Sequence, residues 1–408
     1  MSQNEQFIPK AIFGDIEQLR SREIPSQILP TFHADYQQAT DFLLSYQKNP
    51  ETFKSYRREI ERFCHWSWHF AKLTFSQLSR EDLESYLQFC RKPPNHWIGT
   101  KNVARFKKAE GRLIPNPEWR PYVARVSKAE RTLGKKPSAN HYTLSDDGFK
   151  VIFAVLQGFF KHMVLADYLP VNIVDLIKQK TTYYRKQQGR AKVRRIAPMQ
   201  WDVVMETAEN MARENPEKHE RTLFIISLLY GLYLRVSELA ASDRWMPQMC
   251  HFEKDYEDNW WFRTLGKGNK ERTIAVSNSV LKALARWRKY LGAMTDLPTP
   301  TDNLPLVCSQ SQDRPISSTR QIRNIVQSCF DAAVQKLEQE EHKHQAAELR
   351  EATVHWLRHT GISDDVKFRP REHVRDDAGH SSSMITDRYI DIDSRERHQS
   401  AKDKQLTN

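Results

Sequence analysis

Apolar positions in the first half of the chain recur with the period of an α-helix. Near Thr52 they fall on one side of a helix, at Phe53, Tyr56, Ile60 and Phe63. The other side carries a straight basic stripe, spaced four residues apart, of Lys54, Arg58 and Arg62. We predict a helix that starts near Thr52. The stripe is either a solvated surface, because glutamates lie nearby, or a contact for an anionic partner.

A second core helix is predicted after Ser145, where Asp146 and Asp147 complete a helix start. Its apolar face comprises Ile152, Val155, Leu156, Phe159, Phe160 and Met163, and Pro170 marks its end. Residues 1–34 show no sustained period and are predicted to form a tail. Residues 93–142 are rich in Pro, Gly and basic residues, which indicates an insertion or long loop within a helical domain at 35–180.

The second half of the chain combines helices with one strand-turn-strand pattern. Helices are predicted at 201–211 and 221–233, at 318–337, and after Glu351. Between them, Trp260 to Phe262 and Thr273 to Val276 flank a glycine-containing turn, which is typical of a β-hairpin. The charged stretch 335–350 predicts a solvated helix. The expected fold class is therefore mainly α, with a small β-sheet in the C-terminal domain.

A basic segment separates the two halves. Residues 181–195 contain no acidic side chain and include four cations that we name as candidate DNA contacts: Arg185, Lys186, Arg190 and Lys192. A segment of this kind either follows a phosphate backbone or is a plain flexible linker. We place the domain boundary here, with a second domain at 196–390 and a C-terminal tail at 391–408.

Composition narrows the partner and the compartment. The chain has 408 residues and a formal net charge of +12, which favours a polyanionic partner such as nucleic acid. No stretch reaches the roughly 20 apolar residues that span a bilayer, and the N-terminus does not resemble a signal peptide, so no membrane is expected. The five cysteines are scattered without a CxxC pair, which fits a reducing cytoplasm.

Two cations in the second half occupy unusual positions. Arg235 directly follows a strongly apolar run, where a guanidinium is costly without a charged partner, and Glu238 could hold it. A purely structural Arg–Glu pair explains the same pattern. Lys267 lies in the predicted turn between two glycines, which allow close approach to another backbone. An ordinary hairpin with exposed lysines is the alternative.

The remaining candidates lie near the C-terminus. His355 and Arg358 share one helix face, and His359 follows directly. His355 and His359 could pair on a metal, but no third ligand is apparent, so no metal site is predicted. His380 precedes Tyr389 by nine residues. A phosphodiester can be attacked by a tyrosine if arginines stabilise the charge on its oxygens and a Lys or His donates a proton to the leaving group.

The ordered set of these residues resembles the tyrosine site-specific recombinases, the family of phage integrases and chromosome-dimer resolvases. The likeness rests on LRVSEL at 234–239, GKGNKER at 266–272, HWLRHT at 355–360 and the spacing from His380 to Tyr389. There are two departures: Tyr233 stands where the family usually has glycine, and Ala378 where it usually has leucine.

The resemblance implies a role for each matched residue. Tyr389 would form a 3′-phosphotyrosyl bond, Arg235 and Arg358 would clamp the phosphate, and Lys267 would protonate the leaving oxygen. His355 and His380 would assist proton transfer, without a metal or other cofactor.

The resemblance also implies a two-domain clamp on double-stranded DNA, with a helical core-binding domain that presents Lys54, Arg58 and Arg62. A homotetramer would pass through a Holliday junction, as in the integration or excision of a mobile element, and the C-terminal tail could dock on a neighbouring protomer. Two alternatives stay open: a type IB topoisomerase-like enzyme that relaxes DNA, and a non-catalytic DNA-binding regulator.

Overall fold

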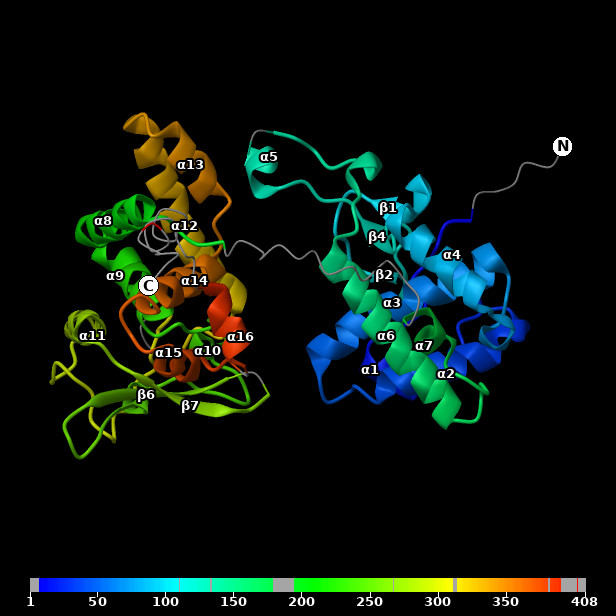
Figure 1. Cartoon of the computed structure of the whole chain (residues 1–408), viewed down its shortest axis with the longest axis horizontal. Helices are drawn as coiled ribbons and strands as arrows, with labels where there is room; N and C mark the ends of the chain where they lie inside the picture. Colours follow the sequence, from blue (N-terminus) through cyan, green and yellow to red (C-terminus); the bar gives the residue numbers. More distant parts are fainter. Residues whose placement is uncertain are drawn as a thin grey trace, which may run out of the picture. The chain divides into compact units, whose positions relative to one another are not determined.

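The chain divides into two compact units, residues 1–186 and 187–408. The computed structural model describes residues 7–109, 111–132, 134–178, 194–266, 268–310, 314–380, 382–389 and 402 (Figure 1). The division falls within the predicted linker, most of which lies outside the described residues. Helices dominate both units, and the strands are short.

The described part of the N-terminal unit is a helical body with four short strands. Its elements are α1 (Ile16–Arg20), η1 (Pro30–Phe32), α2 (His33–Leu44), α3 (Pro50–His65), the π-helical η2 (Trp66–Ala71), η3 (Phe75–Gln77), α4 (Arg80–Arg91), η4 (Asn95–Trp97), β1 (Ile98–Gly99), β2 (Phe106–Ala109), β3 (Arg112–Pro115), β4 (Tyr122–Val123), α5 (Lys128–Thr132), η5 (Ala139–His141), α6 (Asp146–Leu165) and α7 (Ile173–Lys178).

The core of this unit is aromatic and centres on α3 and α6. The rings of Phe63, Phe75 and Phe159 follow one another at centroid distances of 5.3 and 5.4 Å. The predicted apolar face of α6 is buried throughout, and Ser145 caps the helix by accepting the Gly148 N–H at 3.1 Å. Both predicted helices are confirmed, although α6 ends at Leu165, before Pro170.

Helix α6 is long and apolar enough to cross a membrane by length and composition alone. It nevertheless lies in the core of the N-terminal unit, where it packs against α2, α3 and α7. A core helix of a folded domain passes the same test, so α6 gives no argument for a membrane span.

The expectation of an N-terminal tail is wrong for the described residues 7–34. Ala11, Ile12, Phe13 and Leu19 are buried in the core. The reason is a backbone contact, since Glu61 of α3 accepts the N–H groups of Ile12 at 2.7 Å and Phe13 at 3.2 Å. Such a contact leaves no period in the sequence.

The predicted insertion at 93–142 contains short paired strands rather than only loop. Strands β2 and β3 form an antiparallel hairpin, and β1 pairs with β4 in parallel. Trp97 and Tyr122 anchor this segment in the core of the unit, where they are 3% and 0% exposed. The insertion is therefore part of the folded unit.

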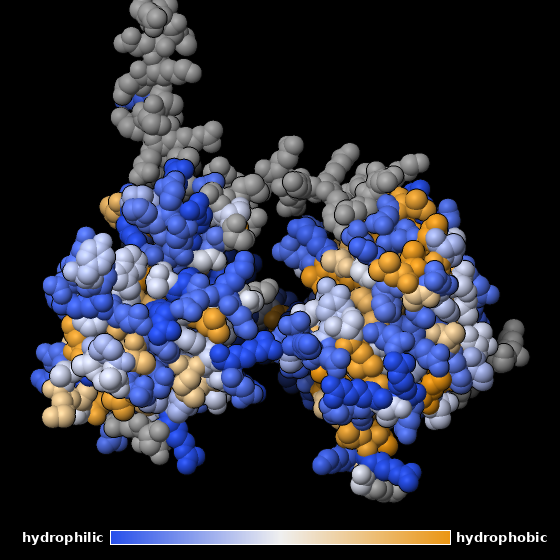
Figure 2. Space-filling view, turned by 90° about the horizontal axis from the view of Figure 1, so that it is seen from below, coloured by the Kyte–Doolittle hydropathy of each residue, from blue (hydrophilic) through white to orange (hydrophobic). Residues whose placement is uncertain are grey.

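The C-terminal unit surrounds the helix α9 (Pro216–Gly231), which packs against α8 (Pro198–Glu214), α11 (Asn278–Tyr290), α12 (Thr319–Gln339) and α14 (Val354–Asp365). The other elements are α10 (Val236–Leu239), η7 (Met249–His251), β5 (Phe252–Lys254), β6 (Trp260–Leu265), β7 (Glu271–Ala275), α13 (Lys343–Arg350), α15 (Arg371–Ala378), α16 (Ser383–Thr386) and η8 (Asp387–Tyr389). The hydrophilic colour of most of the surface in Figure 2 agrees with the polar composition.

The predicted hairpin belongs to an antiparallel sheet of order β5-β6-β7. Helix α15 packs against β7, which brings the C-terminal segment to the sheet. The predicted helix at 335–350 is broken between α12 and α13, and Ala346 and Leu349 are buried, so it is not solvated on all sides. The mainly helical fold with a small sheet is confirmed.

Glu61 should be a major determinant of stability in the N-terminal unit. Besides Ile12 and Phe13 it holds Arg105, and its side chain is 1% exposed. Glu61→Ala would leave two buried N–H groups without their acceptor, and the partly buried Arg105 guanidinium with only the Phe13 carbonyl. We expect a loss of about 3–5 kcal/mol in the free energy of unfolding, measured by urea denaturation.

The matched control is Glu51→Ala. Glu51 pairs with Lys54 at 2.8 Å, but its side chain is 89% exposed. An exposed pair contributes roughly 0–1 kcal/mol. Equal effects of the two substitutions would contradict the assignment of Glu61.

Candidate active site

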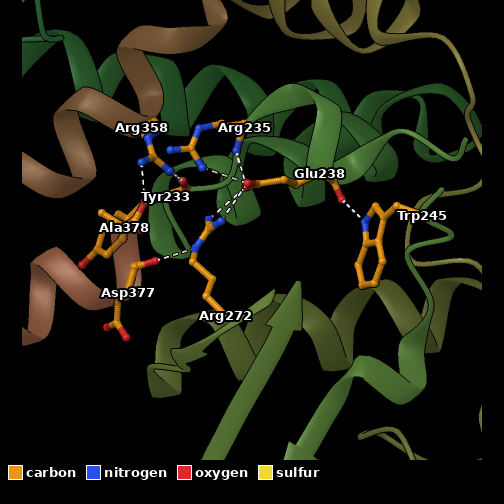
Figure 3. Close-up of polar contacts among 8 residues, drawn as sticks. All are labelled: Tyr233, Arg235, Glu238, Trp245, Arg272, Arg358, Asp377 and Ala378. Carbon is orange, nitrogen blue, oxygen red and sulfur yellow. Dashed lines mark hydrogen bonds and ion pairs between the residues drawn. The ribbon is translucent and has the colours of Figure 1, made fainter. Parts of the chain in front are cut away.

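A buried carboxylate holds two arginines in the C-terminal unit. Glu238 in α10 is 1% exposed. It accepts the Arg235 N–H at 2.8 Å and Nη1 at 3.0 Å. Arg272 of β7 binds the same carboxylate through Nη1 at 2.7 Å and Nη2 at 3.0 Å (Figure 3). Burial opposes ionisation, but these bonds outweigh it and lower the pKa of Glu238.

Arg358 is held differently. It lies in α14, is 5% exposed, and donates to two backbone carbonyls, those of Tyr233 and, at 2.6 Å, Ala378 (Figure 3). Among the described residues it has no carboxylate ion-pair partner. Burial, reinforced by the charges of Arg235 and Arg272, lowers the pKa of Arg358 to about 9. Three guanidiniums around one carboxylate leave excess positive charge, which suits an anionic ligand.

The role of Arg272 was missed in the sequence. It lies within GKGNKER, yet only Lys267 of that motif was singled out. Its side chain is 10% exposed, and its Nε donates to the Asp377 carbonyl at 2.9 Å. The motif that contains Lys267 was already expected to approach the site, and Arg272 lies in the same motif. That shared position could have identified Arg272 as a site residue.

The phenol of Tyr389 is 7% exposed and bonds to a histidine. Its Oη lies 2.8 Å from Nδ1 of His359. Burial, with the charges of Arg358 and His355, lowers the pKa of His359 to about 4, so the imidazole is neutral at pH 7. A neutral ring can accept the phenol proton. The sequence suggested His359 only as half of a metal pair.

His380 stacks on Tyr389, with ring centroids 5.6 Å apart and an interplanar angle of 12°. Its Nδ1 lies 2.9 Å from Thr386 Oγ1, and burial lowers its pKa to about 4. The preceding Gly379 has φ +62°, and a Cβ there would lie 2.9 Å from Arg272 Cδ. Glycine is therefore required both by the backbone and by the approach of Arg272.

His355 lies on α14, partly open to solvent. The partial burial of its ring, with the charges of Arg323, Arg358 and Arg235, lowers its pKa. Lys267 lies outside the described residues, as do Arg185, Lys186, Arg190 and Lys192. The structure thus brings together the predicted Arg235, Arg358, His380 and Tyr389, and adds Arg272 and His359.

The predicted basic stripe of α3 is only partly available to a ligand. The Lys54 and Arg58 side chains are 60% and 50% exposed. Arg62 is 11% exposed, bonds Glu59 and the Pro121 carbonyl, and lies over the Tyr122 ring at 4.4 Å. Arg62 therefore has structural contacts, and our expectation that it presents to DNA with the other two is corrected.

A basic cleft of about 720 Å³ opens beside α3. Lys54 and Arg58 form one side, and Lys101, Arg120 and Arg125 of the insertion also line it. With Arg57, Arg62 and Arg105, eight basic side chains line the cleft. Two acidic side chains, Glu59 and Asp147, also line it. Within the described residues no group of three or more His, Cys, Asp or Glu side chains could hold a metal ion.

One curated relative shares part of the sequence. The chain is 39% identical over 90 residues to tyrosine recombinase XerC from Corynebacterium glutamicum, a match that covers 22% of this chain and 27% of the relative. The match thus spans about a quarter of the relative's length. It supports the resemblance to tyrosine recombinases seen in the motifs. No family model matches the chain.

Several solved structures have a similar course of the chain. XerH site-specific recombinase in a post-cleavage complex with palindromic difH substrate gives a TM-score of 0.49 at 14% identity, covering 95% of this chain and 92% of that one. The Tn1549 transposon integrase with circular intermediate DNA gives 0.47 at 13%, covering 90% and 99%. A lambda integrase dimer on a COC′ core site gives 0.46 at 11%, covering 94% and 85%.

The histidines of the site should make stability depend on pH. Their pKa is about 6.5 in an unfolded chain and about 4 here for His359 and His380. Between these values the unfolded state binds more protons than the folded state. The contribution of these histidines to the free energy of unfolding is therefore complete above pH 6.5 and is lost as the pH falls toward 4. We expect the Tm, measured by calorimetry, to fall across this window.

His359→Gln should reduce that pH dependence, because one histidine that resists protonation has been removed. His344→Gln is the control, since the His344 side chain is 80% exposed. An unchanged pH dependence in His359→Gln would show that His359 is not held neutral by the fold.

Proposed function

We propose that this chain is a tyrosine recombinase, which cuts and rejoins DNA strands with Tyr389 as the nucleophile. The observation that carries the proposal is the buried Arg358, which lacks a described carboxylate partner. The next residue of α14, His359, bonds to the Tyr389 phenol. Arg235 and Arg272, both bound to Glu238, add to the positive charge around it.

In the proposed reaction Tyr389 Oη attacks the scissile phosphorus and its proton passes to His359. The negative charge of the bound phosphate would raise the low pKa of His359 and so stabilise the protonated ring. The bond from phosphorus to the 5′-oxygen breaks, and Lys267 protonates that oxygen. A phenol has a pKa near 10, so only about one part in a thousand is ionised at pH 7, and a neighbouring base assists attack. The phosphotyrosyl ester retains the energy of the bond, so rejoining needs no nucleotide.

The three arginines have two different roles in this step. Charge gathers on the non-bridging oxygens in the transition state, and guanidiniums can donate paired hydrogen bonds to them. Arg235 and Arg358 would bind the phosphate, while Arg272 keeps Glu238 ionised and in place. His355 and His380 border the same region and would hydrogen-bond the phosphate or assist proton transfer.

The biological setting is proposed from the family resemblance. Four protomers on double-stranded DNA would exchange strands through a Holliday junction during integration or excision of a mobile element, and the tail at 391–408 would dock on a neighbour. A cytoplasmic location accords with the five cysteines, all of which are free.

The test is a suicide DNA substrate that is nicked beside the cleavage point and traps the covalent intermediate. Wild-type protein should form a protein–DNA adduct, and Tyr389→Phe should form none. Arg235→Ala and Arg358→Ala should lower adduct formation by about 100-fold or more while DNA affinity is largely retained. Arg213→Ala, on the exposed surface of α8, is the control.

Two outcomes would favour other functions. DNA binding without any wild-type adduct would indicate a regulator on a recombinase fold. Rapid relaxation of plasmid that lacks a specific site would indicate a type IB topoisomerase-like enzyme. Loss of DNA binding in step with cleavage would show that the arginines have a structural role.

We also propose that the basic cleft beside α3 binds the DNA backbone. Each lost phosphate contact should reduce the slope of log affinity against log salt by about 0.9. Lys54→Glu with Arg58→Glu, and separately Lys101→Glu with Arg125→Glu, should each weaken binding and reduce the slope by about two, measured by fluorescence anisotropy at several salt concentrations.

The control for these reversals is Lys92→Glu with Lys161→Glu. Both lysines are exposed on the same unit but do not line the cleft. The net charge changes equally, so an equal effect would mean that overall charge, rather than the cleft, determines binding.

A further inference from the structure

Tyr233 has a backbone conformation that large side chains rarely adopt. It follows α9, with φ +49°, and is 1% exposed. In this left-handed region the Cβ of an L-residue is crowded, and an aromatic residue there is an outlier. Strain of this kind persists only where surrounding contacts enforce it, and it is often found at functional sites.

The backbone of Tyr233 contacts the candidate site. Its carbonyl accepts Nη1 of Arg358, and the Ala378 carbonyl accepts Nη2 (Figure 3). These two bonds fix the plane of the guanidinium. Arg358 has five N–H groups, so donors remain for an anion.

The phenol of Tyr233 provides the contacts that enforce the strain. Its Oη donates to Asp365 Oδ2 and accepts Nη1 of Arg369 at 3.0 Å. Burial and the Asp365 carboxylate raise the pKa of Tyr233, so the phenol stays protonated and remains a donor. The side chain therefore anchors this backbone to the end of α14.

The same network reaches the other carbonyl acceptors of the site. Arg369 binds Asp365 at 3.2 Å and Asp377 at 2.5 Å. The Asp377 carbonyl accepts Arg272, and the next carbonyl, of Ala378, accepts Arg358. The ring of Tyr233 also shares a buried apolar cluster with Tyr389.

We propose that Tyr233 is a positioning residue, whose anchored phenol holds its strained carbonyl against Arg358 and so sets that guanidinium for the phosphate. This inference rests on the proposed function. Glycine at position 233 could adopt the same backbone conformation, but it would lack the phenol that binds Asp365 and Arg369.

The test compares Tyr233→Phe with Tyr230→Phe. Tyr230 donates to Asp364 at 3.1 Å, one residue before Asp365, so both substitutions remove a phenol–carboxylate bond to α14. Tyr233→Phe should slow adduct formation on the suicide substrate by about tenfold or more, with unchanged DNA affinity. Tyr230→Phe should leave the rate unchanged. Thermal melting verifies that both variants fold.

Two further arms separate positioning from a merely structural effect. Tyr233→Gly adopts the left-handed backbone without strain but lacks the anchor, so it should also be slow. On a substrate with a neutral methylphosphonate at the scissile position, the need for an aligned guanidinium is reduced. There Tyr233→Phe should come within about twofold of wild type.

Each outcome decides the inference. A wild-type rate in Tyr233→Phe or Tyr233→Gly would overturn it, as would equal slowing in Tyr230→Phe or a defect that persists on the methylphosphonate. If wild-type protein forms no adduct on the charged substrate, the proposed function fails and this inference with it. If wild-type protein forms the adduct and Tyr233→Phe forms it at the same rate, this inference is wrong while the proposed function stands.

Discussion

The candidate site depends on the pairing of one buried carboxylate with two guanidiniums. Glu238 binds Arg272 through both oxygens and Arg235 through its backbone and side chain. Burying any of these charges alone would be costly, and removal of the carboxylate would leave two cations unpaired. This pairing ties the loop after α9 to β7. Through the bond from Arg272 to the Asp377 carbonyl, it also fixes the end of α15, from which the chain continues to Tyr389.

Much of the site could be predicted because it consists of short motifs. The spacing of Arg235 and Glu238 indicated their pairing, and the order of Arg358, His380 and Tyr389 indicated chemistry. Arg272 could not be assigned in this way. Its partner lies 34 residues earlier, and only the fold brings the two together. His359 was given no role for a similar reason, since its contact with Tyr389 depends on the return of the chain at η8 rather than on helix spacing.

The fold was predicted well where apolar residues recur over several turns. Helices α3 and α6 each bury a long stripe of apolar side chains, and such a stripe appears in the sequence as a helical period of apolar residues. It fails where burial is irregular. The segment around Ile12 is held through backbone groups by Glu61, and Arg62 is drawn inward by Glu59 and Tyr122. Neither contact leaves a period, so the first was interpreted as a tail and the second as exposed surface.

The use of carbonyls to hold Arg358 has an electrostatic consequence. A carboxylate of its own would orient the Arg358 guanidinium but would also offset its charge, whereas the single Glu238 carboxylate is shared by Arg235 and Arg272 and offsets only part of theirs. Carbonyl dipoles orient it without neutralising it, at the cost of a buried cation whose pKa is lowered to about 9. An incoming phosphate would relieve that cost, because it supplies the missing negative charge. Because a neutral carbonyl attracts the guanidinium less strongly than a carboxylate, the carbonyl itself must be held in place by other contacts. Asp365 and Arg369 bind the Tyr233 phenol and so hold the Tyr233 carbonyl against Arg358.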